Sequence, residues 1–397
     1  MTVVSTADTS VVIAKTLDNL EPHLGDLQML ANSSIEPNAF YEPWMLVPAL
    51  RWLYPPKGLQ MVLIFRSGVS GEKPKLIGFF PLEIRGVYNH FPVKTVRLWR
   101  HKFCYLCTPL LHREYAREAL GAFMSWLESR KSQGKILEFG QVRGEGPVHD
   151  VIVERLWKNA KPSLVDVRWV RPCMYRASSS QEFLDRSLSS RHQKDLQKKE
   201  KKLCQIGNVK YASPETAVDA DRWTQEFLAL EAKGWRGQQG LAISNQPSGP
   251  EFFQEAMKAA WDAGRLRMIG LALDFSFIAI KINLACNGGA FAFMITYDEA
   301  YSAYSPGLLL EVENIRRFHQ DASSTWMDSC ADQNSSLFTR VWPDKRTIET
   351  LLMSADSLIG DFWMSAIPFG HFLKRSVTPP HKLPRRSSPN QTLNRRS

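Results

Sequence analysis

The sequence predicts an α/β (α+β) protein of two successive modules, each with a mixed twisted sheet flanked by helices. Three observations support this prediction. The chain has 397 residues, enough for about two domains. Its composition, 44% hydrophobic and 11% aromatic, supplies apolar cores and excludes a disordered or fibrous chain. The same order of elements, namely helix, antiparallel strands, helix and strand, occurs twice along the chain.

The first of these series begins after residues 1–31, which are weakly patterned and which we expect to be peripheral. Pro43 opens a predicted helix, and the pair Pro55-Pro56 ends it. Two β-rich runs then form a hairpin around a polar turn. The predicted elements are helices at 43–53 and 113–131, and strands at 60–65, 76–84, 95–105 and 135–139.

The second series follows a predicted linker that contains Pro162, Pro172 and the serines at 178–180. Its predicted strands are at 209–211, 265–274, 277–284, 289–296 and 325–328, and its helices at 220–232, 251–263 and from 306 onward. These patterns predict a first module at 32–175, a second at 176–370 and a disordered basic tail at 371–397.

The formal net charge of +10 is concentrated in two segments. Residues 374–397 contribute +7, residues 191–202 contribute +4, and the rest of the chain sums to −1. The sequence therefore gives no reason to expect a DNA-binding surface.

Cysteine usage and hydropathy indicate the compartment. The six cysteines are scattered, as expected in a reducing environment. Residues 1–10 lack the pattern of a signal peptide, and the apolar run at 269–282 is too short to span a bilayer. Cys104 and Cys107 have the spacing of a metal pair, but no second pair follows, so we expect no metal and a buried strand there. We expect a cytoplasmic protein without a transmembrane segment.

Several stretches in order carry a family resemblance. They are residues 188–196 (LSSRHQKDL), 231–237 (EAKGWRG), 297–298 (YD), 304–307 (YSPG) and 326–332 (WMDSCAD), followed by Trp342 and Arg346. With them the second half resembles the CelD/BcsL-like family of GNAT-fold acyltransferases, relatives of the FemAB peptidyltransferases. The first half matches more loosely, at 38–50 and 108–111. The resemblance implies tandem GNAT-like (acyl-CoA N-acyltransferase) modules, the first of them degenerate.

The resemblance also implies a donor site. In this fold two neighbouring parallel strands splay, and the pantetheine arm of an acyl-CoA lies between them like an added strand. Its diphosphate lies at the start of the next helix, which places Ser305, Pro306, Gly307 and Leu308 as donor-binding residues. The glycine-rich loop of ordinary GNAT enzymes is absent at this position. The alternative interpretation of Ser-Pro-Gly is a simple helix start.

The resemblance also suggests catalytic residues, at the ends of the two strands that separate in this fold. Asp328 and Asp298 end the two strands that should splay and are our candidates for the base. Tyr297 is a candidate for the acid, and the alternatives are Tyr304 or a reaction without a protein acid. Each aspartate has the alternative of a turn or cap role. We interpret Cys330 as a buried structural cysteine, because no histidine is placed to activate it.

Two pairs of residues are candidates for substrate binding. Trp235 and Arg236 place an aromatic ring next to a cation between two glycines, and Arg191 and Lys194 lie on a predicted basic helix. The alternatives are a tryptophan that packs at the domain edge and an ordinary solvated helix face.

The sequence thus predicts an acyltransferase that moves an acyl group from acyl-CoA, acetyl-CoA included, to an amine or hydroxyl. The expected acceptor is a polar small molecule, a saccharide or a molecule related to the cell envelope. One alternative is a FemAB-like aminoacyl transferase that uses aminoacyl-tRNA, with residues 191–202 on the RNA. Another is a non-catalytic GNAT-like binding module in exopolysaccharide synthesis. The sequence leaves the oligomeric state open.

Overall fold

The structure is a computed structural model that describes residues 2–5, 8–68, 71–129, 134–158, 161–331, 336–355 and 358–377. They fall into two units. Unit 1 comprises Met1–Pro43, Pro55–Val170 and Thr347–Ser397, and unit 2 comprises Trp44–Tyr54 and Arg171–Arg346. This division differs from the predicted modules: residues 1–31 and the chain after 347 belong to unit 1.

Unit 1 is built on a sheet whose strand order is β1-β2-β3-β4-β5-β7-β14, with β6 paired to β4. The strands are β1 Thr2–Ser5, β2 Thr9–Ala14, β3 Gln60–Arg66, β4 Lys75–Arg85, β5 Thr95–Leu98, β6 Leu110–Leu111, β7 Ile136–Arg143 and β14 Asp344–Ser354. Strand β2 pairs with β3 and buries Val11 to Ala14. The expectation that residues 1–31 are peripheral is therefore wrong, because their apolar side chains complete this core. The strand expected at 95–105 ends at Leu98, and Cys104 and Cys107 follow it outside any strand.

The helices of unit 1 are α1 Leu17–Leu20, η1 Glu21–His23, α2 Leu24–Ser33, η2 Ala39–Tyr41, α4 Ala116–Ser129, α5 Pro147–Lys158 and α13 Leu358–Val377. Helix α3 Pro43–Trp52 begins at the boundary and continues in unit 2. Since α13 extends to Val377, the predicted disorder from residue 371 is wrong for residues 371–377. The rest of that predicted tail, residues 378–397, lies outside the described residues.

Unit 2 has the strand order β8-β13-β12-β11-β10-β9. The strand β8 Ser163–Tyr175 belongs to unit 2 only from Arg171 onward. The other strands are β9 Val209–Ala212, β10 Leu266–Leu273, β11 Ser276–Cys286, β12 Gly289–Tyr297 and β13 Trp326–Asp328. The predicted linker is largely the strand β8, whose Cys173 to Tyr175 pair with β13. Pro172 is tolerated within it although proline cannot donate a ladder hydrogen bond.

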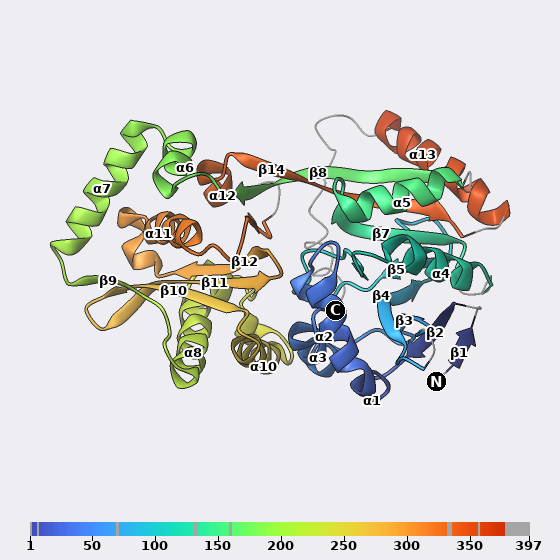
Figure 1. Cartoon of the computed structure of the whole chain (residues 1–397). Coiled ribbons are helices and arrows are strands. Elements are labelled where there is room, and N and C mark those ends of the chain that lie inside the picture. Colours follow the sequence, from blue (N-terminus) through green and yellow to red (C-terminus); the bar gives the residue numbers. More distant parts are fainter. Residues whose placement is uncertain are drawn as a thin grey trace. The chain divides into compact units, whose positions relative to one another are not determined.

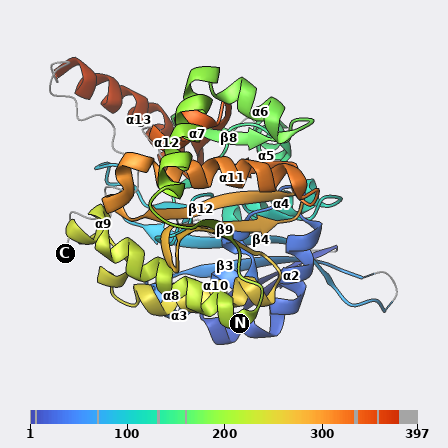
Figure 2. The ribbon, with the colours of Figure 1, turned by 90° about the vertical axis from the view of Figure 1, so that its left-hand side faces the viewer.

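The helices of unit 2 cover both faces of its sheet. Figures 1 and 2 show α6, α7 and α11 on one face and α8 and α10 on the other. The helices are α6 Ser180–Ser187, α7 Ser190–Cys204, α8 Ala217–Lys233, α9 Trp235–Gln238, η3 Ile243–Asn245, α10 Gly249–Asp262, η4 Glu299–Tyr304, α11 Pro306–Gln320 and α12 Ser336–Val341. This layered arrangement and the repeated order of elements confirm the predicted fold class.

Among the described residues, each unit contains a parallel strand pair joined through a crossover helix. In unit 1, β5 and β7 pair over three residues and α4 connects them. In unit 2, β12 and β13 pair over three residues and α11 connects them. The predicted duplication of architecture is therefore present, although the two sequences share no visible repeat.

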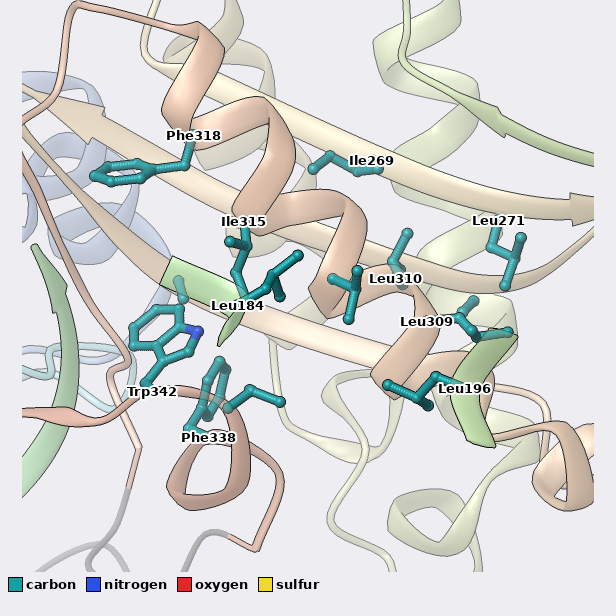
Figure 3. Close-up of a cluster of buried hydrophobic side chains, with 14 of the residues drawn as sticks. Leu184, Leu196, Ile269, Leu271, Leu309, Leu310, Ile315, Phe318, Phe338 and Trp342 are labelled. Atoms are coloured by element: carbon teal, nitrogen blue, oxygen red, sulfur yellow. The ribbon is translucent and has the colours of Figure 1, made fainter. Parts of the chain in front are cut away.

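The core of unit 2 lies between α11 and the sheet (Figure 3). Leu309, Leu310 and Ile315 point from α11 into a cluster that also contains Phe338 and Trp342. All three side chains are buried, with at most 3% of their surface exposed. This packing fixes the position of α11, and with it the position of the helix start that follows β12.

Candidate functional site

Strands β12 and β13 separate after a short paired segment. They pair in parallel at Gly289 with Trp326, Ala290 with Met327, and Phe291 with Asp328. Strand β12 then continues for six residues to Tyr297, and no strand of the described residues pairs with it on that side. We call the point beyond Phe291 and Asp328 the fork. The six residues span roughly 20 Å at about 3.3 Å per residue.

Helix α11 begins just beyond the far end of this unpaired edge. Ser305 takes a left-handed conformation with φ of 56°, and its carbonyl accepts hydrogen bonds from the N–H groups of Leu308 and Leu309, each at 3.0 Å. Pro306 occupies the first turn, as the sequence predicted. A Cβ on Gly307 would lie 3.2 Å from the Tyr297 ring, so glycine permits close packing there.

The charged group at this helix start is Lys199, which the sequence analysis missed. Its ammonium donates to the Ser305 hydroxyl at 3.0 Å and forms an ion pair with Asp195 at 3.2 Å. Several lysines share its segment, and only tertiary packing distinguishes it from them. The positive end of the α11 dipole and a lysine therefore face the same place, which favours an anionic ligand.

Arg191 and Lys194 are on the same helix as Lys199 but do not contact the start of α11 in any interaction of the described residues. Both are exposed. At 1.5 Å per residue, Lys194 and Arg191 lie roughly 8 and 12 Å from Lys199 along the axis of α7. They form part of an exposed basic face.

Tyr297 and Asp298 lie at the same end of β12. Tyr297 is partly exposed, and its ring packs against Gly307. Asp298 is the N-cap of η4, where its carboxylate accepts from the N–H of Ala300 at 2.9 Å. The capping alternative for Asp298 is thus present in the structure.

Asp328 lies at the fork and is completely buried. Its two carboxylate oxygens accept hydrogen bonds from Arg171 at 3.1 Å and from Arg346 at 3.0 Å, and the N–H of Cys330 donates at 2.8 Å. Burial alone would raise the pKa of Asp328, but the two guanidiniums hold it below its ordinary value. A carboxylate stabilised in its charged form is a weak base.

The two candidate bases are far apart. Asp328 is level with Phe291, whereas Asp298 follows β12 seven residues further on. This corresponds to roughly 20 Å along the strand. The structure therefore places the two aspartates at opposite ends of the unpaired edge, and they do not act on one atom.

A buried polar network lies on the α11 side of the sheet. Lys281 pairs with Glu311 at 2.8 Å, and both side chains are fully buried. Glu311 also accepts hydrogen bonds from Trp342 at 3.0 Å and from Asn314 at 2.9 Å. Asn283 extends the network by donating to Asn314 at 2.8 Å. These contacts tie β11, α11 and the segment after α12 together.

Trp235 and Arg236 form a partly exposed corner that is joined to η4. The N–H of Trp235 donates to Glu299 at 2.7 Å, and the Arg236 guanidinium lies 5.3 Å from the Trp235 ring centroid. Arg236 also pairs with Glu231 at 3.5 Å. Gly237 is required here, because a Cβ would lie 1.8 Å from the carbonyl oxygen of Ala232. The corner is thus held next to the segment that leads to Ser305.

Cys330, beside Asp328 at the fork, is not activated as a nucleophile. Burial and the neighbouring Asp328 raise the pKa of Cys330 well above its ordinary value, so the thiol stays protonated. Cys104 and Cys107 are buried in unit 1 with their sulfurs 3.8 Å apart. Within the described ranges there is no group of three or more His, Cys, Asp or Glu residues arranged to hold a metal. Of the helices in those ranges, none combines the length and hydropathy needed to cross a membrane.

Comparison with known proteins identifies the class. Residues 190–334 match the family model described as an acetyltransferase (GNAT) domain. No curated protein matches the chain. FemX is similar in structure, with a TM-score of 0.55 and 9% identity over 83% of this chain and 95% of that chain. So is the C-terminal DUF2156 domain of a putative lysylphosphatidylglycerol synthetase from Agrobacterium fabrum, with a TM-score of 0.50 and 8% identity over 87% and 96%.

The fold of unit 2, with its separating parallel strands and the helix start after β12, agrees with the family model that matches residues 190–334. With its matching segment at 190–334, the chain contains a GNAT acetyltransferase domain in unit 2. At 9% and 8% identity, the similarity to these two structures supports a shared fold and no shared function.

Proposed function

We propose that unit 2 binds an acyl-CoA along the unpaired edge of β12 and transfers the acyl group to an amine or hydroxyl of a polar acceptor. The observation that supports this proposal is the length of the unpaired edge of β12 and its position next to the start of α11. Residues 292–297 extend past the fork, and α11 begins beyond them with Lys199 at Ser305. A pantetheine arm can add to such an edge in the manner of a strand.

The proposed donor orientation follows from charge. The diphosphate would lie at Ser305, Pro306, Gly307 and Leu308, where the α11 dipole and the Lys199 ammonium both favour an anion. The thioester would then lie toward the fork. Trp235 and Arg236, on the η4 side, would contact the nucleotide part of the donor or the acceptor.

The reaction proposed is direct transfer. The acceptor nitrogen or oxygen forms a bond to the thioester carbonyl carbon, the carbon–sulfur bond breaks, and the acceptor proton ends on the coenzyme A thiol. At the fork we assign Asp328 the role of a positioning residue that holds Arg171 and Arg346. Asp298 and Tyr297, the base and acid candidates from the sequence, lie in this orientation beside the diphosphate and roughly 20 Å from the thioester, so we assign them no proton transfer. As part of this proposal the reaction takes place in the cytoplasm.

Ligand-dependent thermal unfolding tests the donor. Acetyl-CoA, a longer acyl-CoA and free coenzyme A at 100 times their Kd should each stabilise the protein by about 2.7 kcal/mol, or about 5–10 °C in Tm. At the same ligand concentrations Lys199→Met should reduce the stabilisation to about 1.4 kcal/mol, half of the wild-type shift, whereas Lys198→Met, an exposed neighbour on the same helix, should keep the full shift. The absence of a shift with all three ligands would reject acyl-CoA as the donor.

The exposed basic face of α7 favours aminoacyl-tRNA as a second candidate donor. Its exposed cations are Arg191, Lys194, Lys198, Lys201 and Lys202. Backbone phosphates bind such faces with strong salt dependence. Binding of aminoacyl-tRNA that weakens when Lys194, Lys198 and Lys201 become glutamine, without any response to coenzyme A, would favour this donor. Binding of either ligand without transfer would favour the non-catalytic alternative.

A further inference from the structure

Helix α13 of unit 1 has apolar residues on two opposite sides. Met364 and Ile367 are buried in a cluster with Tyr88, Val93 and Leu352. The other side is exposed to solvent. Its large apolar side chains have high exposed fractions: Leu358 88%, Ile359 53%, Phe362 65% and Phe369 62%.

The exposed side chains lie on one face. At about 100° per residue, Leu358, Phe362 and Phe369 fall within about 40° of one another around the helix axis, and Ile359 lies at the edge of the same face. Met364 and Ile367 fall on the opposite side. The contiguous exposed face therefore has no packing role in the core of unit 1, and such faces mark interaction sites.

A strongly basic segment adjoins this face in the sequence. Residues 374–397 contain seven lysines and arginines and no acidic residue. The segment begins within α13, at Lys374 and Arg375, and contributes most of the net charge of the chain.

We propose that α13 and the adjoining basic segment dock this chain on an anionic lipid surface. Leu358, Ile359, Phe362 and Phe369 would enter the boundary between headgroups and acyl chains, and the cations would contact lipid phosphates. An apolar face next to clustered positive charge matches an anionic bilayer, because the bilayer has an apolar interior and a negatively charged surface. A second copy of the chain is a less favourable partner for this face. A symmetric contact through α13 would bring two basic segments together, and their charges repel.

Vesicle co-sedimentation of the full chain tests this proposal. Vesicles of phosphatidylcholine with about 30% phosphatidylglycerol should bind the protein, and binding should fall at least tenfold between about 0.05 M and 0.5 M salt. Phosphatidylcholine alone should bind it weakly. A double variant, Phe362→Ser with Phe369→Ser, should bind anionic vesicles about tenfold more weakly.

The matched control is Phe275→Ser, since Phe275 is a fully exposed phenylalanine in the turn between β10 and β11. It should leave vesicle binding unchanged. Arg385→Gln with Arg386→Gln leaves the sequence of α13 unchanged and should weaken binding, and thermal unfolding should show that each variant is folded. Equal binding by the Phe362/Phe369 variant and the wild type would overturn the proposal. So would a dimer that dissociates in that variant while vesicles bind neither protein.

Discussion

Replacing Asp328 by asparagine removes the carboxylate that Arg171 and Arg346 share at the fork. The two arginine side chains are 2% and 1% exposed, and Asp328 is fully buried. The asparagine can still accept the Cys330 N–H hydrogen bond, but two buried guanidiniums lose their counter-charge. Breaking a buried ion pair from one side costs about 3–5 kcal/mol.

The expected result is a large loss of stability. For a unit of this size each kcal/mol lowers Tm by about 2–4 °C, so Asp328→Asn should lower the Tm of unit 2 by roughly 6–20 °C. Differential scanning calorimetry measures this, with Asp298→Asn as control, because asparagine also caps helices well. If Asp328 were instead the catalytic base, the variant would lose turnover and keep its Tm. A Tm within about 1 °C of wild type would refute the ion-pair account.

The pH dependence gives an independent check on Asp328. Its pKa is lower in the folded protein than the ordinary value of about 3.9. The carboxylate therefore contributes its stability at every pH above about 4, and the contribution is lost as pH falls through the folded pKa. The difference in unfolding free energy between wild type and Asp328→Asn should be constant from pH 5 to 8 and shrink only below about pH 4.

Three further changes test other parts of the account. Gly307→Val should weaken coenzyme A binding about tenfold by calorimetry while the fold stays intact, because the new side chain meets only the partly exposed Tyr297 ring; unchanged affinity would remove the diphosphate from this helix start. Lys199→Met should likewise cost about tenfold in affinity, and an equal loss in Lys198→Met would point to general charge instead. Burial lowers the pKa of His101 to about 3, so unit 1 should lose about 2 kcal/mol of stability between pH 7 and pH 5 through this group. His101→Gln should remove that part of the loss in urea unfolding, and an unchanged pH profile would contradict it.

Local patterns predicted most of the elements around the site. The Ser-Pro-Gly sequence predicted the start of α11 because proline is favoured in the first turn of a helix, which is a local effect. The alternation in 265–296 likewise predicted β10, β11 and β12, since turns at Asp274 and Gly288 separate them.

Features that depend on distant partners were missed. Strand β8 was predicted to be a linker because Pro162 before it and Pro172 within it suggest irregular chain, yet its end pairs with β13 more than 150 residues away. Helix α13 continues through Pro368, since Met364 and Ile367 anchor it against unit 1. Asp328 was placed correctly on its strand, but its partner Arg171 is 157 residues earlier and has no local pattern.

Hydrogen–deuterium exchange with and without coenzyme A tests the donor site most directly. Binding along the open edge should slow exchange in peptides that cover residues 292–297 and 305–309, with little change in unit 1. Protection confined to other segments, with these peptides unaffected at saturating ligand, would contradict the proposal that β12 and the start of α11 hold the donor.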